Sequence, residues 1–470
     1  MKVMLIRYHN LNNINTRLPE SINKVQGIYP PLGLAYVAST LESFGHEVYI
    51  LDSRALNLTV EETKKRIERI NPDVVGTTCM TSTIRGSLEV AYLAKQISED
   101  IVTVIGGPQL FIYPKETVSH EFVDFGVAGE GEIVMPELMM ALEGKKKFRE
   151  IDGLVYKDDG IKFNPAKRYV SNLDSLPFPA RHLLPNHKYF SILSDHPFTT
   201  MITSRGCPFK CGYCFRKDID RIVRYRSAKN VVDEIEYCLD KWRFREIWFY
   251  DDTFTMNRRH VTQICKEIME RGLDFKWEAV TRVDCVNRGL LKLMKRAGCK
   301  RVRYGVESGD QETLNIMKKG ITIEQAKKAI RWTKEAGMEN FCFFMVGYPN
   351  EDARKIENTI NFAKELDIDW AMFSNVTPYP ATDLFELAYE KGLLKDKEYW
   401  RKFTLGDTDE RIPYEFPDME RWVKKAYLTF YLRPKFMIKT LAKVRSPRDF
   451  KKYLLGLYAI LNFRMFDSRT

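Results

Sequence analysis

Short apolar runs alternate with stretches of helical periodicity over the first third of the chain. Apolar residues that recur every three or four positions predict helices over residues 32–44, 60–70 and 84–97. Between and after them, short apolar runs predict strands at residues 3–6, 47–51, 74–77, 103–105 and 125–127. This alternation predicts a parallel, doubly wound sheet, and ligands bind such sheets at the carboxyl ends of the strands.

The same alternation restarts in the second half of the chain, after a different pattern. Asp159 and Gly160 lie between two β-rich runs, which predicts a hairpin over residues 151–163. The proline-rich residues 176–181 predict an extended connection. Further apolar runs predict strands at residues 200–204, 246–250, 276–280, 301–305, 340–345 and 370–376. Six strand–helix units predict an open, partial barrel whose chemistry takes place at the carboxyl ends of the strands.

The pattern thus predicts an α/β protein made of consecutive segments. A doubly wound, Rossmann-like domain is expected over residues 1–145, and a hairpin with a linker over residues 146–195. A partial (β/α)6 barrel of the TIM type is expected over residues 196–396, and a basic helical region over residues 397–470. A chain of 470 residues is long enough for two domains and a tail.

The composition is that of a globular protein with an excess of positive charge. Hydrophobic residues make up 44% of the chain and charged residues 29%, and the formal net charge is +11. This charge predicts an anionic partner, such as a phosphate, a nucleic acid, a polyanionic cofactor or a membrane surface. Residues 421–469 are especially rich in Lys and Arg, but no nucleic-acid-binding motif accompanies them. We therefore expect no nucleic-acid partner.

Nine cysteines, an odd number in a long chain, do not indicate a disulfide framework. Those in apolar or helical contexts are expected to be buried thiols: Cys79, Cys238, Cys265, Cys285, Cys299 and Cys342. The first residues read as a short apolar strand rather than a signal peptide. No apolar run approaches the roughly 20 residues that a membrane span needs. A reducing cytoplasm is therefore the expected compartment.

The remaining cysteines, Cys207, Cys211 and Cys214, lie in one short run after the first strand of the predicted barrel. A four-iron cluster is normally held by four thiolates, so three on one loop would leave one iron without a protein ligand. An open coordination position distinguishes a catalytic metal site from a closed structural one. A zinc knuckle is the alternative, but it requires another ligand, and no His or Cys lies between Cys214 and Cys238.

This run resembles the signature of the radical S-adenosylmethionine (SAM) superfamily, Cys-x-x-x-Cys-x-x-Cys, with the aromatic Tyr213 before its third cysteine. The resemblance implies that the loop cysteines bind a [4Fe–4S] cluster whose open iron chelates the amino and carboxylate groups of SAM. It also implies reductive cleavage of SAM to a 5′-deoxyadenosyl radical, which removes a hydrogen atom from the substrate. An electron donor such as a reductase, ferredoxin or flavodoxin is then an expected partner.

Polar residues follow the other predicted barrel strands, where SAM would bind. Charged residues at such positions are costly unless they are paired or bind a ligand. Asp251 or Asp252 is expected to face the SAM ammonium group. The other residues expected at the SAM site are Tyr213, Arg282, Glu307, Ser308, Gly347 and Thr377. For any single one of them, a structural ion pair or a helix cap is the alternative.

The loops of the first domain resemble the cobalamin-binding domain that precedes many radical SAM barrels. The resemblance rests on Pro-Pro-Leu-Gly at residues 30–33, Gly-Gly-Pro at 106–108 and Gly-Glu-Gly-Glu at 129–132. It implies cobalamin contacts from Pro30, Leu32, Gly33, Asp52, Thr77, Thr78, Gly106, Gly107, Pro108, Gln109, Gly129, Glu130, Gly131 and Glu132. The Asp-x-His-x-x-Gly motif is absent and His9 lies in a different setting, so base-off cobalamin without a His ligand is expected. A degenerate domain that binds nothing is the alternative.

The tail combines aromatic and basic residues. Residues 422–432 and 453–463 have amphipathic helical patterns. The basic residues around them are Lys435, Lys439, Lys443, Arg445, Arg448, Lys451 and Lys452. One hypothesis is a helical cap over the barrel mouth. The other is a surface that meets anionic lipid headgroups through basic residues and acyl chains through aromatic residues.

With these resemblances, the sequence predicts a cobalamin-dependent radical SAM enzyme that methylates an unactivated carbon. The tail suggests an apolar substrate, such as a lipid, an isoprenoid or a tetrapyrrole. A radical ring-forming or oxidative reaction, as in relatives of the anaerobic magnesium-protoporphyrin ester cyclase, is the first alternative. A non-catalytic corrinoid-binding sensor is the second, although the intact cysteine run argues against it. The motifs do not separate methyl transfer from ring formation.

Overall fold

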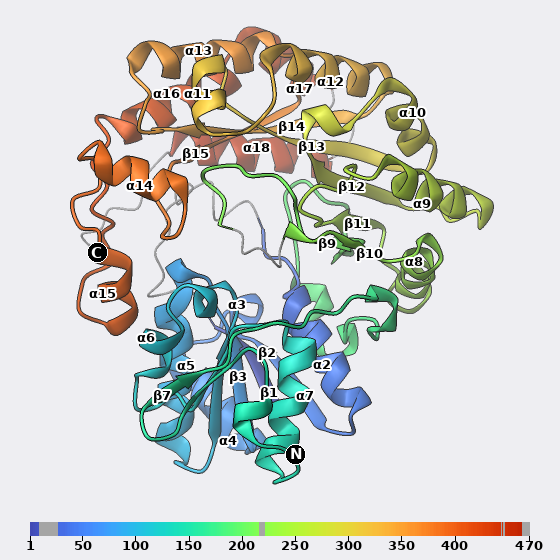
Figure 1. Ribbon diagram of the computed structural model, residues 1–470. Coiled ribbons are helices and arrows are strands. Elements are labelled where there is room, and N and C mark those ends of the chain that lie inside the picture. The colour runs from blue at the N-terminus through green and yellow to red at the C-terminus, as the bar shows by residue number, and fades with distance from the viewer. Residues whose placement is uncertain (9–26, 216–220, 443, 445–446, 463–470) are drawn as a thin grey trace. The chain divides into compact units, whose positions relative to one another are not determined.

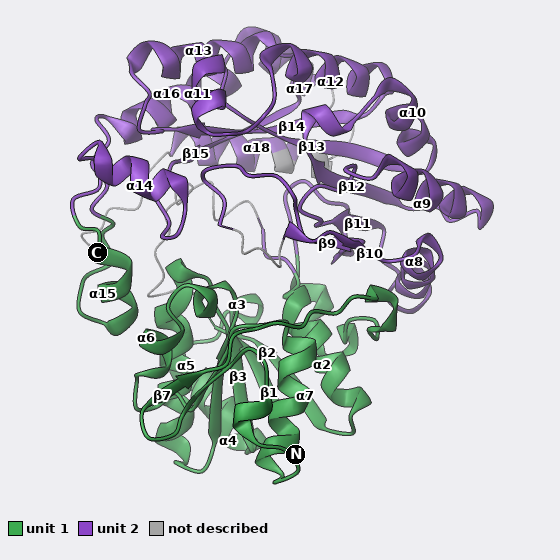
Figure 2. Ribbon diagram, in the orientation of Figure 1, with its two compact units in different colours: residues 1–14, 30–189, 396–412 green, residues 15–29, 190–395, 413–470 purple. Residues whose placement is uncertain are grey.

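The computed structural model describes residues 1–8, 27–215, 221–442, 444 and 447–462, and the chain divides into two units (Figure 1, Figure 2). Unit 1 comprises residues 1–14, 30–189 and 396–412, and unit 2 comprises residues 15–29, 190–395 and 413–470. Each unit has its own main sheet. His9, Lys443 and Arg445, named above, lie outside the described residues.

The sheet of unit 1 has the strand order β2-β1-β3-β4-β5-β6-β7 (Figure 1). Its strands are β1 (Lys2–Arg7), β2 (Glu47–Asp52), β3 (Val74–Thr78), β4 (Val102–Gly106), β5 (Phe125–Val127), β6 (Leu154–Lys157) and β7 (Ile161–Phe163). Its main helices are α2 (Leu32–Ser43), α3 (Ser53–Leu56), α4 (Val60–Ile70), α5 (Ile84–Ile97), α6 (Pro114–Val118) and α7 (Gly131–Leu142). Strands β1 to β5 are parallel, and the order reverses beside β1, which confirms the predicted doubly wound sheet.

Alternate residues of β1 enter separate cores on the two faces of this sheet. Val3 and Leu5 join the core that contains residues of α2 and α7. Met4 and Ile6 join the core that contains residues of α4 and α5. A strand covered by helices on both faces is apolar at successive positions, which explains the continuous apolar run in the sequence.

Two segments that the sequence analysis placed outside the first domain belong to unit 1. The hairpin forms as predicted, but β6 pairs with β5 in antiparallel orientation and so extends the sheet. Residues 396–412, which contain α15 (Tyr399–Leu405), also pack in unit 1. Gln109 Nε2 donates a hydrogen bond to Thr404 Oγ1 at 2.8 Å, and Phe403 is fully buried. These contacts join residues far apart in the chain, so local patterns do not reveal them.

Unit 2 contains a parallel sheet in the order β15-β14-β13-β12-β11-β8 (Figure 1). Its strands are β8 (Phe198–Met201), β11 (Glu246–Phe249), β12 (Lys276–Thr281), β13 (Cys299–Glu307), β14 (Glu339–Val346) and β15 (Trp370–Asn375). Neighbours in space follow chain order from β8 to β15, which confirms the predicted partial barrel. A short antiparallel pair, β9 (Ser204–Arg205) and β10 (Arg224–Tyr225), follows β8.

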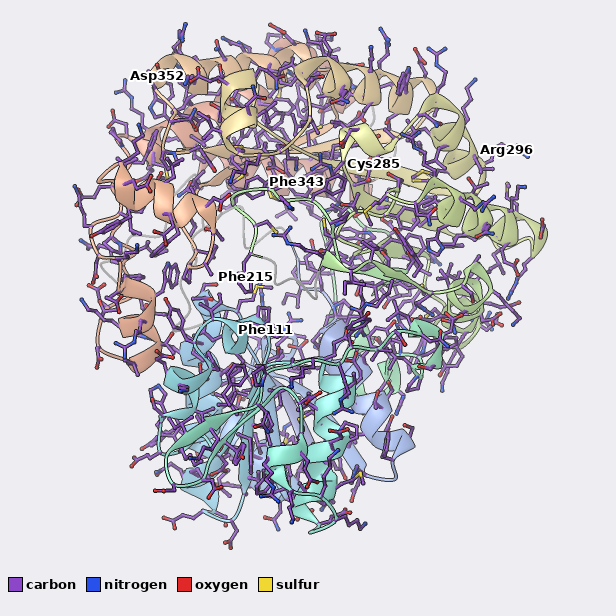
Figure 3. All side chains as sticks on the ribbon, viewed as in Figure 1. Phe111, Phe215, Cys285, Arg296, Phe343 and Asp352 are labelled. Carbon is purple, nitrogen blue, oxygen red and sulfur yellow. The ribbon has the colours of Figure 1, made fainter. Side chains whose placement is uncertain are left out.

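Several helices of unit 2 begin at residues whose side chains cap them. They are α8 (Ala228–Trp242), α9 (Arg258–Glu270), α10 (Arg288–Arg296), α11 (Gln311–Ile316), α12 (Ile323–Glu335), α13 (Ala353–Glu365), α14 (Asp383–Glu390), α16 (Met419–Tyr431), α17 (Pro434–Leu441) and α18 (Pro447–Leu461). Ser227, Asn257 and Asp352 each accept a hydrogen bond from a backbone N–H of the following first turn. Arg296 and Asp352 lie on the outer side of the unit, whereas Phe343 of β14 lies within it (Figure 3).

The edge strand β15 is closed by a helix of the tail. Tyr431 Oη accepts a hydrogen bond from Ala371 N at 3.1 Å and donates one to Ala371 O at 2.6 Å. Tyr427 Oη accepts a hydrogen bond from Phe373 N at 3.3 Å. Both tyrosines belong to α16, whose buried side chains join the barrel core. Helix α16 is therefore part of the barrel, because it satisfies backbone groups that an open edge would expose.

Short 3-10 helices complete the two units: η1 (Thr81–Thr83), η2 (Pro108–Phe111), η3 (Phe148–Glu150), η4 (Leu173–Ser175), η5 (Arg181–Leu183), η6 (Asn186–Lys188) and η8 (Val283–Cys285). Over the described residues, no helix combines the length and the apolar character that crossing a membrane requires.

Candidate functional site

The cysteine loop of unit 2 follows β9 and is fixed to the barrel at its centre. Gly212 N donates a hydrogen bond to Met317 O at 2.8 Å, and Gly212 O accepts one from Leu384 N at 2.8 Å. Cys214 N donates to Cys211 O at 3.0 Å, which turns the chain between the last two cysteines. The loop therefore has a shape that the barrel imposes on it.

The loop cysteines are accessible and the other cysteines are buried, as predicted. Cys207 and Cys211 are half-buried and Cys214 is exposed, whereas all the others are buried. Burial raises the pKa of the Cys265 thiol to about 12 and that of the Cys285 thiol to about 11. These two thiols therefore stay protonated and inert at neutral pH. The loop thiols are the ones that a cofactor can reach.

The loop thiols fit an iron–sulfur cluster better than a single metal ion. Zinc requires its ligands within about 2.3 Å of one centre. The described residues contain no group of His, Cys, Asp or Glu side chains close enough to hold one ion in this way. In a four-iron cluster each thiolate binds its own iron, so the sulfurs stand further apart. Cys207, Cys211 and Cys214 are the accessible thiols that would hold a [4Fe–4S] cluster with one open iron.

Arg282, directly after β12, directs its guanidinium at the cysteine loop. Its Nη1 lies 3.6 Å from Cys211 Sγ, and its guanidinium carbon lies 3.7 Å from the ring centre of Phe209. The other nitrogens donate to both oxygens of Asp284 at 2.9 Å and to Lys319 O at 2.7 Å. The arginine is 5% exposed. A fixed positive charge therefore lies beside one of the cluster-binding thiols.

Asp251, two residues after β11, is turned toward the start of the cysteine loop. Its carboxylate accepts hydrogen bonds from Thr203 N at 3.0 Å, Thr203 Oγ1 at 2.9 Å and Ser204 Oγ at 2.5 Å. Burial raises the pKa of this carboxyl to about 6, against the opposing effect of these hydrogen bonds. Asp251 therefore positions the loop, whereas the neighbouring Asp252 is exposed. Of the two candidates for the SAM ammonium contact, the geometry favours Asp252.

Glu307, at the end of β13, has a strained backbone and belongs to a buried polar cluster. A bulge shifts the register after Gly305, and Glu307 has a φ of 71°. Lys319 Nζ donates to Glu307 Oε1 and to Tyr213 Oη, both at 2.9 Å. Tyr213 Oη donates to Glu307 Oε1 at 3.2 Å. The structure thus brings together two residues predicted for the SAM site, and adds Lys319, which no local sequence pattern marks.

A buried carboxylate, Glu351, closes the loop after β14. Its Oε2 accepts hydrogen bonds from Gly347 N at 2.9 Å and Tyr348 N at 2.8 Å. Burial raises the pKa of this carboxyl to about 7, although the two N–H groups oppose the shift. Gly347 has a φ of 92°, and its carbonyl accepts a hydrogen bond from Tyr414 Oη at 2.6 Å. The sequence analysis singled out Gly347 but not Tyr414, which is distant in the chain.

Among the described residues, the loops at the carboxyl ends of the barrel strands contain buried polar atoms without a hydrogen-bond partner. Within the described residues, Glu351 Oε1, Asn350 Oδ1 and Asn375 Oδ1 have no hydrogen-bond partner. Buried polar atoms are normally paired, so such atoms mark a place where a polar ligand fits. Ser308 Oγ already lies 3.1 Å from Thr359 Oγ1, and Thr377 is buried. The carboxyl end of this sheet therefore suits a polar cofactor such as SAM.

Some first-domain residues predicted to contact cobalamin are already engaged within unit 1. Asp52 is fully buried and accepts hydrogen bonds from Ala55 N and Tyr189 Oη, each at 3.0 Å. Glu130 Oε2 accepts one from Val170 N at 2.6 Å. These side chains shape the loops at the carboxyl ends of the strands and do not extend from them.

The predicted glycines of unit 1 bring backbone segments close together. At Gly107, which has a φ of 104°, a Cβ would lie 2.4 Å from Cys79 O. At Gly131, a Cβ would lie 2.7 Å from Val37 Cγ2, where α7 packs on α2. Pro30, Thr77 and Gln109 are buried, whereas the residues left accessible at this edge are Leu32, Gly33, Thr78, Gly106, Pro108, Gly129 and Glu132.

This accessible edge fits a flat macrocycle. A Cβ at Gly33 would meet no atom within 4 Å, so the start of α2 is open. Met80, after β3, presents a large apolar side chain that is 60% exposed. The open position at Gly33 and the exposed Met80 leave backbone and apolar surface accessible to a ligand. The residues of unit 1 therefore fit cobalamin.

The comparisons with known proteins agree with both sites. The Radical SAM superfamily matches residues 201–363 and the B12 binding domain matches residues 21–139. An uncharacterized methyltransferase of Pyrococcus horikoshii, PH0819, is 38% identical over 87% of this chain and 89% of its own length. The chain belongs to the radical SAM enzymes that carry a B12-binding domain. Its family, enzyme class and cofactors, namely a [4Fe–4S] cluster, SAM and cobalamin, are confirmed.

Another relative of this radical SAM enzyme is named as a cyclase, and a solved structure is similar to it in fold. The anaerobic magnesium-protoporphyrin IX monomethyl ester cyclase of Rubrivivax gelatinosus is 31% identical over 92% of this chain and 79% of that protein. The structure of OxsB, a cobalamin-dependent SAM radical enzyme, aligns with a TM-score of 0.70 at 19% identity, over 97% of this chain and 70% of OxsB. That alignment supports the architecture of a doubly wound domain and a partial barrel.

Proposed function

We propose that this enzyme methylates an unactivated carbon, with SAM as the methyl source and cobalamin as the carrier. When bound, the cluster supplies the electron that cleaves SAM, and cobalamin carries the methyl group. The observation that carries the proposal is the presence, in one chain, of a B12-binding domain and an accessible cysteine triad. The P. horikoshii relative, named a methyltransferase and 38% identical, supports the same reaction.

In this proposal the protein side chains bind and orient the cofactors. Cys207, Cys211 and Cys214 hold the cluster, and Arg282 fixes the charge beside it. Asp252 and the Tyr213–Glu307 pair contact SAM at the carboxyl ends of the strands. Lys319 Nζ lies 2.9 Å from Glu307 Oε1, and this contact holds the donors and acceptors of the Tyr213–Glu307 pair in place.

Isotope transfer tests the reaction directly. The reduced, reconstituted enzyme is incubated with deuteriomethyl SAM, and cobalamin is then extracted for mass spectrometry. Deuterium in the cobalamin supports methyl transfer. Enzyme that binds cobalamin and cleaves SAM, yet leaves cobalamin without label, contradicts the methyltransferase proposal.

Radical ring formation or oxidation without methyl transfer is the second candidate. The R. gelatinosus cyclase, 31% identical over nearly the whole of this chain, favours it. Product mass separates the candidates: methyl transfer adds one methyl group, whereas ring formation or hydroxylation does not. Anaerobic comparison of metabolites between a deletion strain and its parent would supply the substrate for that measurement.

We further propose that the substrate is apolar and that the tail contacts membranes reversibly. Helices α17 and α18 expose a set of large apolar side chains, which we term the tail face: Ile438, Leu441, Leu454, Tyr458 and Leu461. Ile438 is 69% exposed and Tyr458 is 64% exposed. Residues 454, 458 and 461 are spaced to share one side of α18. An exposed apolar set beside basic residues is typical of a surface that rests on anionic lipid.

A further inference from the structure

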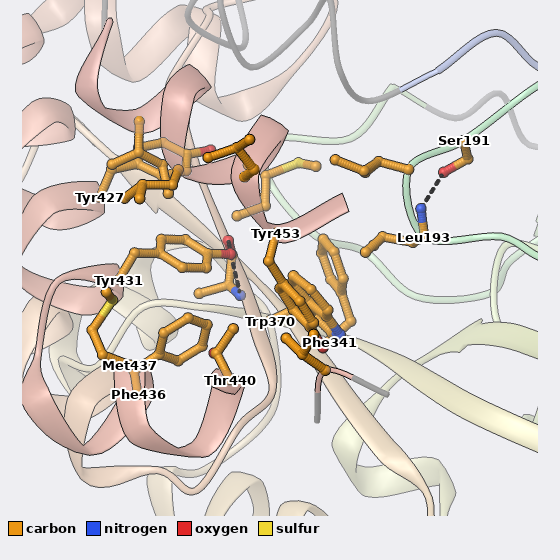
Figure 4. A pocket seen from close by; sticks show the side chains of 18 of the residues that line it. Ser191, Leu193, Phe341, Trp370, Tyr427, Tyr431, Phe436, Met437, Thr440 and Tyr453 are labelled. Carbon is orange, nitrogen blue, oxygen red and sulfur yellow. Dashed lines mark hydrogen bonds between the residues drawn. The ribbon is translucent and has the colours of Figure 1, made fainter. Parts of the chain in front are cut away.

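Unit 2 contains a cavity of about 240 Å³ between the barrel and the tail helices (Figure 4). Its barrel side is formed by the first residues of β14 and β15, including Phe341 and Trp370. Its other side is formed by α16, α17 and α18, including Tyr431, Phe436 and Tyr453. The ring of Tyr453 stacks on that of Trp370, with centres 5.9 Å apart.

This cavity is separate from the cofactor site of the barrel. It adjoins Ser191 and Leu193, which precede β8, and the amino ends of β14 and β15. The cysteine loop and the residues assigned to SAM follow the carboxyl ends of the strands. None of the residues assigned to SAM or to the cluster lines the cavity.

Several polar groups around the cavity have protein partners, whereas the buried Arg303 Nε has no hydrogen-bond partner among the described residues. Tyr431 Oη bonds to both backbone groups of Ala371, and Leu193 N donates to Ser191 Oγ at 3.2 Å. The Arg303 guanidinium lies 2.6 Å from Glu278 and over the ring of Trp248 at 4.1 Å. A trapped water needs between two and four polar partners, which is more than the unpartnered Arg303 Nε supplies. Smaller apolar cavities in proteins stay dry and bind hydrocarbons such as benzene.

The wall and the exposed rim of the cavity share residues. Leu441, Phe450 and Leu454 line the cavity and are also exposed. Leu441 and Leu454 belong to the tail face as well, so an apolar path leads from the tail face into the cavity. Gly456 lies in the wall on α18, where a Cβ would meet no atom within 4 Å. A glycine within a helix is less favourable than alanine, and here it leaves the wall open.

We propose that this cavity binds the hydrocarbon chain of a lipid, which enters from the tail face. The occupant is an apolar chain, because rings and aliphatic groups form most of the lining. Lys435, an exposed basic residue of the tail, lies on the same helix as Ile438 and suits an anionic headgroup outside the cavity. This inference goes beyond the proposed methyl transfer, because binding requires neither SAM nor turnover.

Fluorescence titration of the full chain with cis-parinaric acid, a fatty acid with a fluorescent chain, tests the proposal. We expect saturable binding of one probe per chain. Decane, which has no headgroup, should displace the probe, because the chain is what the cavity recognises. Displacement by anionic lipids alone, with no effect of decane, would mean that the probe binds the basic surface, and it would overturn the proposal.

A cavity-filling substitution provides the structural control. Gly456→Leu adds an apolar side chain in the wall and should lower probe affinity at least tenfold, whereas Gly456→Ala should retain most of it. Ala442→Leu adds a similar side chain to an exposed residue outside the cavity lining and should leave affinity unchanged. Circular dichroism confirms that each variant is folded. Undiminished binding by a folded Gly456→Leu variant would overturn the assignment of the site, and deuterium transfer to cobalamin in the same variant tests the proposed reaction separately.

Discussion

At the scale of single residues, the environment of each thiol decides what it can bind. Cys211 lies on the accessible loop beside Arg282, and Cys265 lies in the core between α9 and the sheet. Replacing Cys211 by Ala should remove the cluster and abolish SAM cleavage, because the remaining loop thiols cannot hold the open iron in place. Replacing the fully buried Cys265 by Ala should leave iron content and cleavage near the wild-type level. Iron and sulfide assays after anaerobic reconstitution measure both variants, and the reverse pattern would contradict the ligand assignment.

Arg282 should set the reduction potential of the cluster. Its guanidinium lies 3.6 Å from Cys211 Sγ, and hydrogen bonds and charges near cluster sulfurs change the potential. A fixed positive charge favours the reduced cluster, which carries the additional electron. Arg282→Gln should therefore shift the midpoint to more negative values, by about 59 mV for each tenfold change in the one-electron equilibrium.

Redox titration followed by electron paramagnetic resonance measures this shift. Arg288→Gln is the matched control, because Arg288 pairs with Glu335 at the surface of unit 2. An unchanged midpoint potential in Arg282→Gln, with normal iron content, would mean that Arg282 has only a structural role in the loop.

Glu351 should make the stability of the enzyme depend on pH. Burial raises the pKa of its carboxyl from 4.5 to about 7 in the folded chain. A raised pKa stabilises the fold fully below pH 4.5, and this contribution disappears as the pH rises to about 7. Glu351→Gln removes the ionisation. The free energy of unfolding of this variant, relative to that of the wild type, should therefore increase as the pH rises from about 5 to about 8.

Urea unfolding at these two pH values measures the effect. Glu357→Gln, on the exposed side of α13, is the control and should show no such trend. Parallel pH profiles for the wild type and Glu351→Gln would show that the carboxyl does not titrate in this range.

At the scale of elements, the tyrosines of α16 take the place of a neighbouring strand. Tyr431→Phe would leave the N–H and C=O groups of Ala371 without their partner at a buried edge. An unsatisfied buried group costs about 1–3 kcal/mol, so the free energy of unfolding should fall by that order. Tyr458→Phe, at an exposed position of α18, is the control and should be neutral. Equal stability of the two variants would mean that water reaches this edge.

The elements that the sequence predicts well are those whose pattern is local. The helices over 60–70 and 84–97 match α4 and α5 residue for residue, because their apolar period and ends are encoded nearby. The first barrel strand was predicted at 200–204, whereas β8 ends at Met201 and Ser204 pairs in β9. That break depends on Asp251, which binds Thr203 and Ser204 from the next strand end.

The residues of the candidate site also differ in whether a local sequence pattern predicts them. The cysteine triad is visible because its ligands lie within eight residues of one another. Lys319 and Tyr414 are not visible, because each reaches the site from a loop far from its partners in the chain. Asp52 and Gln109 stand at the predicted strand ends, but their side chains turn inward to bond with Tyr189 and Thr404. Position along a strand is thus encoded locally, and side-chain direction is not.

At the scale of the whole molecule, the proposed membrane contact rests on the net charge of +11 and on the tail face. Basic residues near an anionic surface contribute about 1 kcal/mol each, and this attraction is screened by salt. Deleting the tail from about Pro417 would not test the tail face, because it also removes α16 and uncovers the barrel core. Single substitutions on α18 keep that core intact.

Tyr458→Glu places a negative charge in the tail face at a side chain that is 64% exposed, so folding should be unaffected. Phe44→Glu is the matched control, because Phe44 is an exposed aromatic residue of unit 1. The wild type and Phe44→Glu should float with vesicles of phosphatidylcholine and phosphatidylglycerol, and Tyr458→Glu should remain with the soluble protein. High salt should weaken flotation of the wild type, since about 1 M salt shortens the screening length to about 3 Å. Flotation of all three proteins alike would place the membrane contact elsewhere, and flotation of none would leave α17 and α18 as the outer wall of the cavity alone.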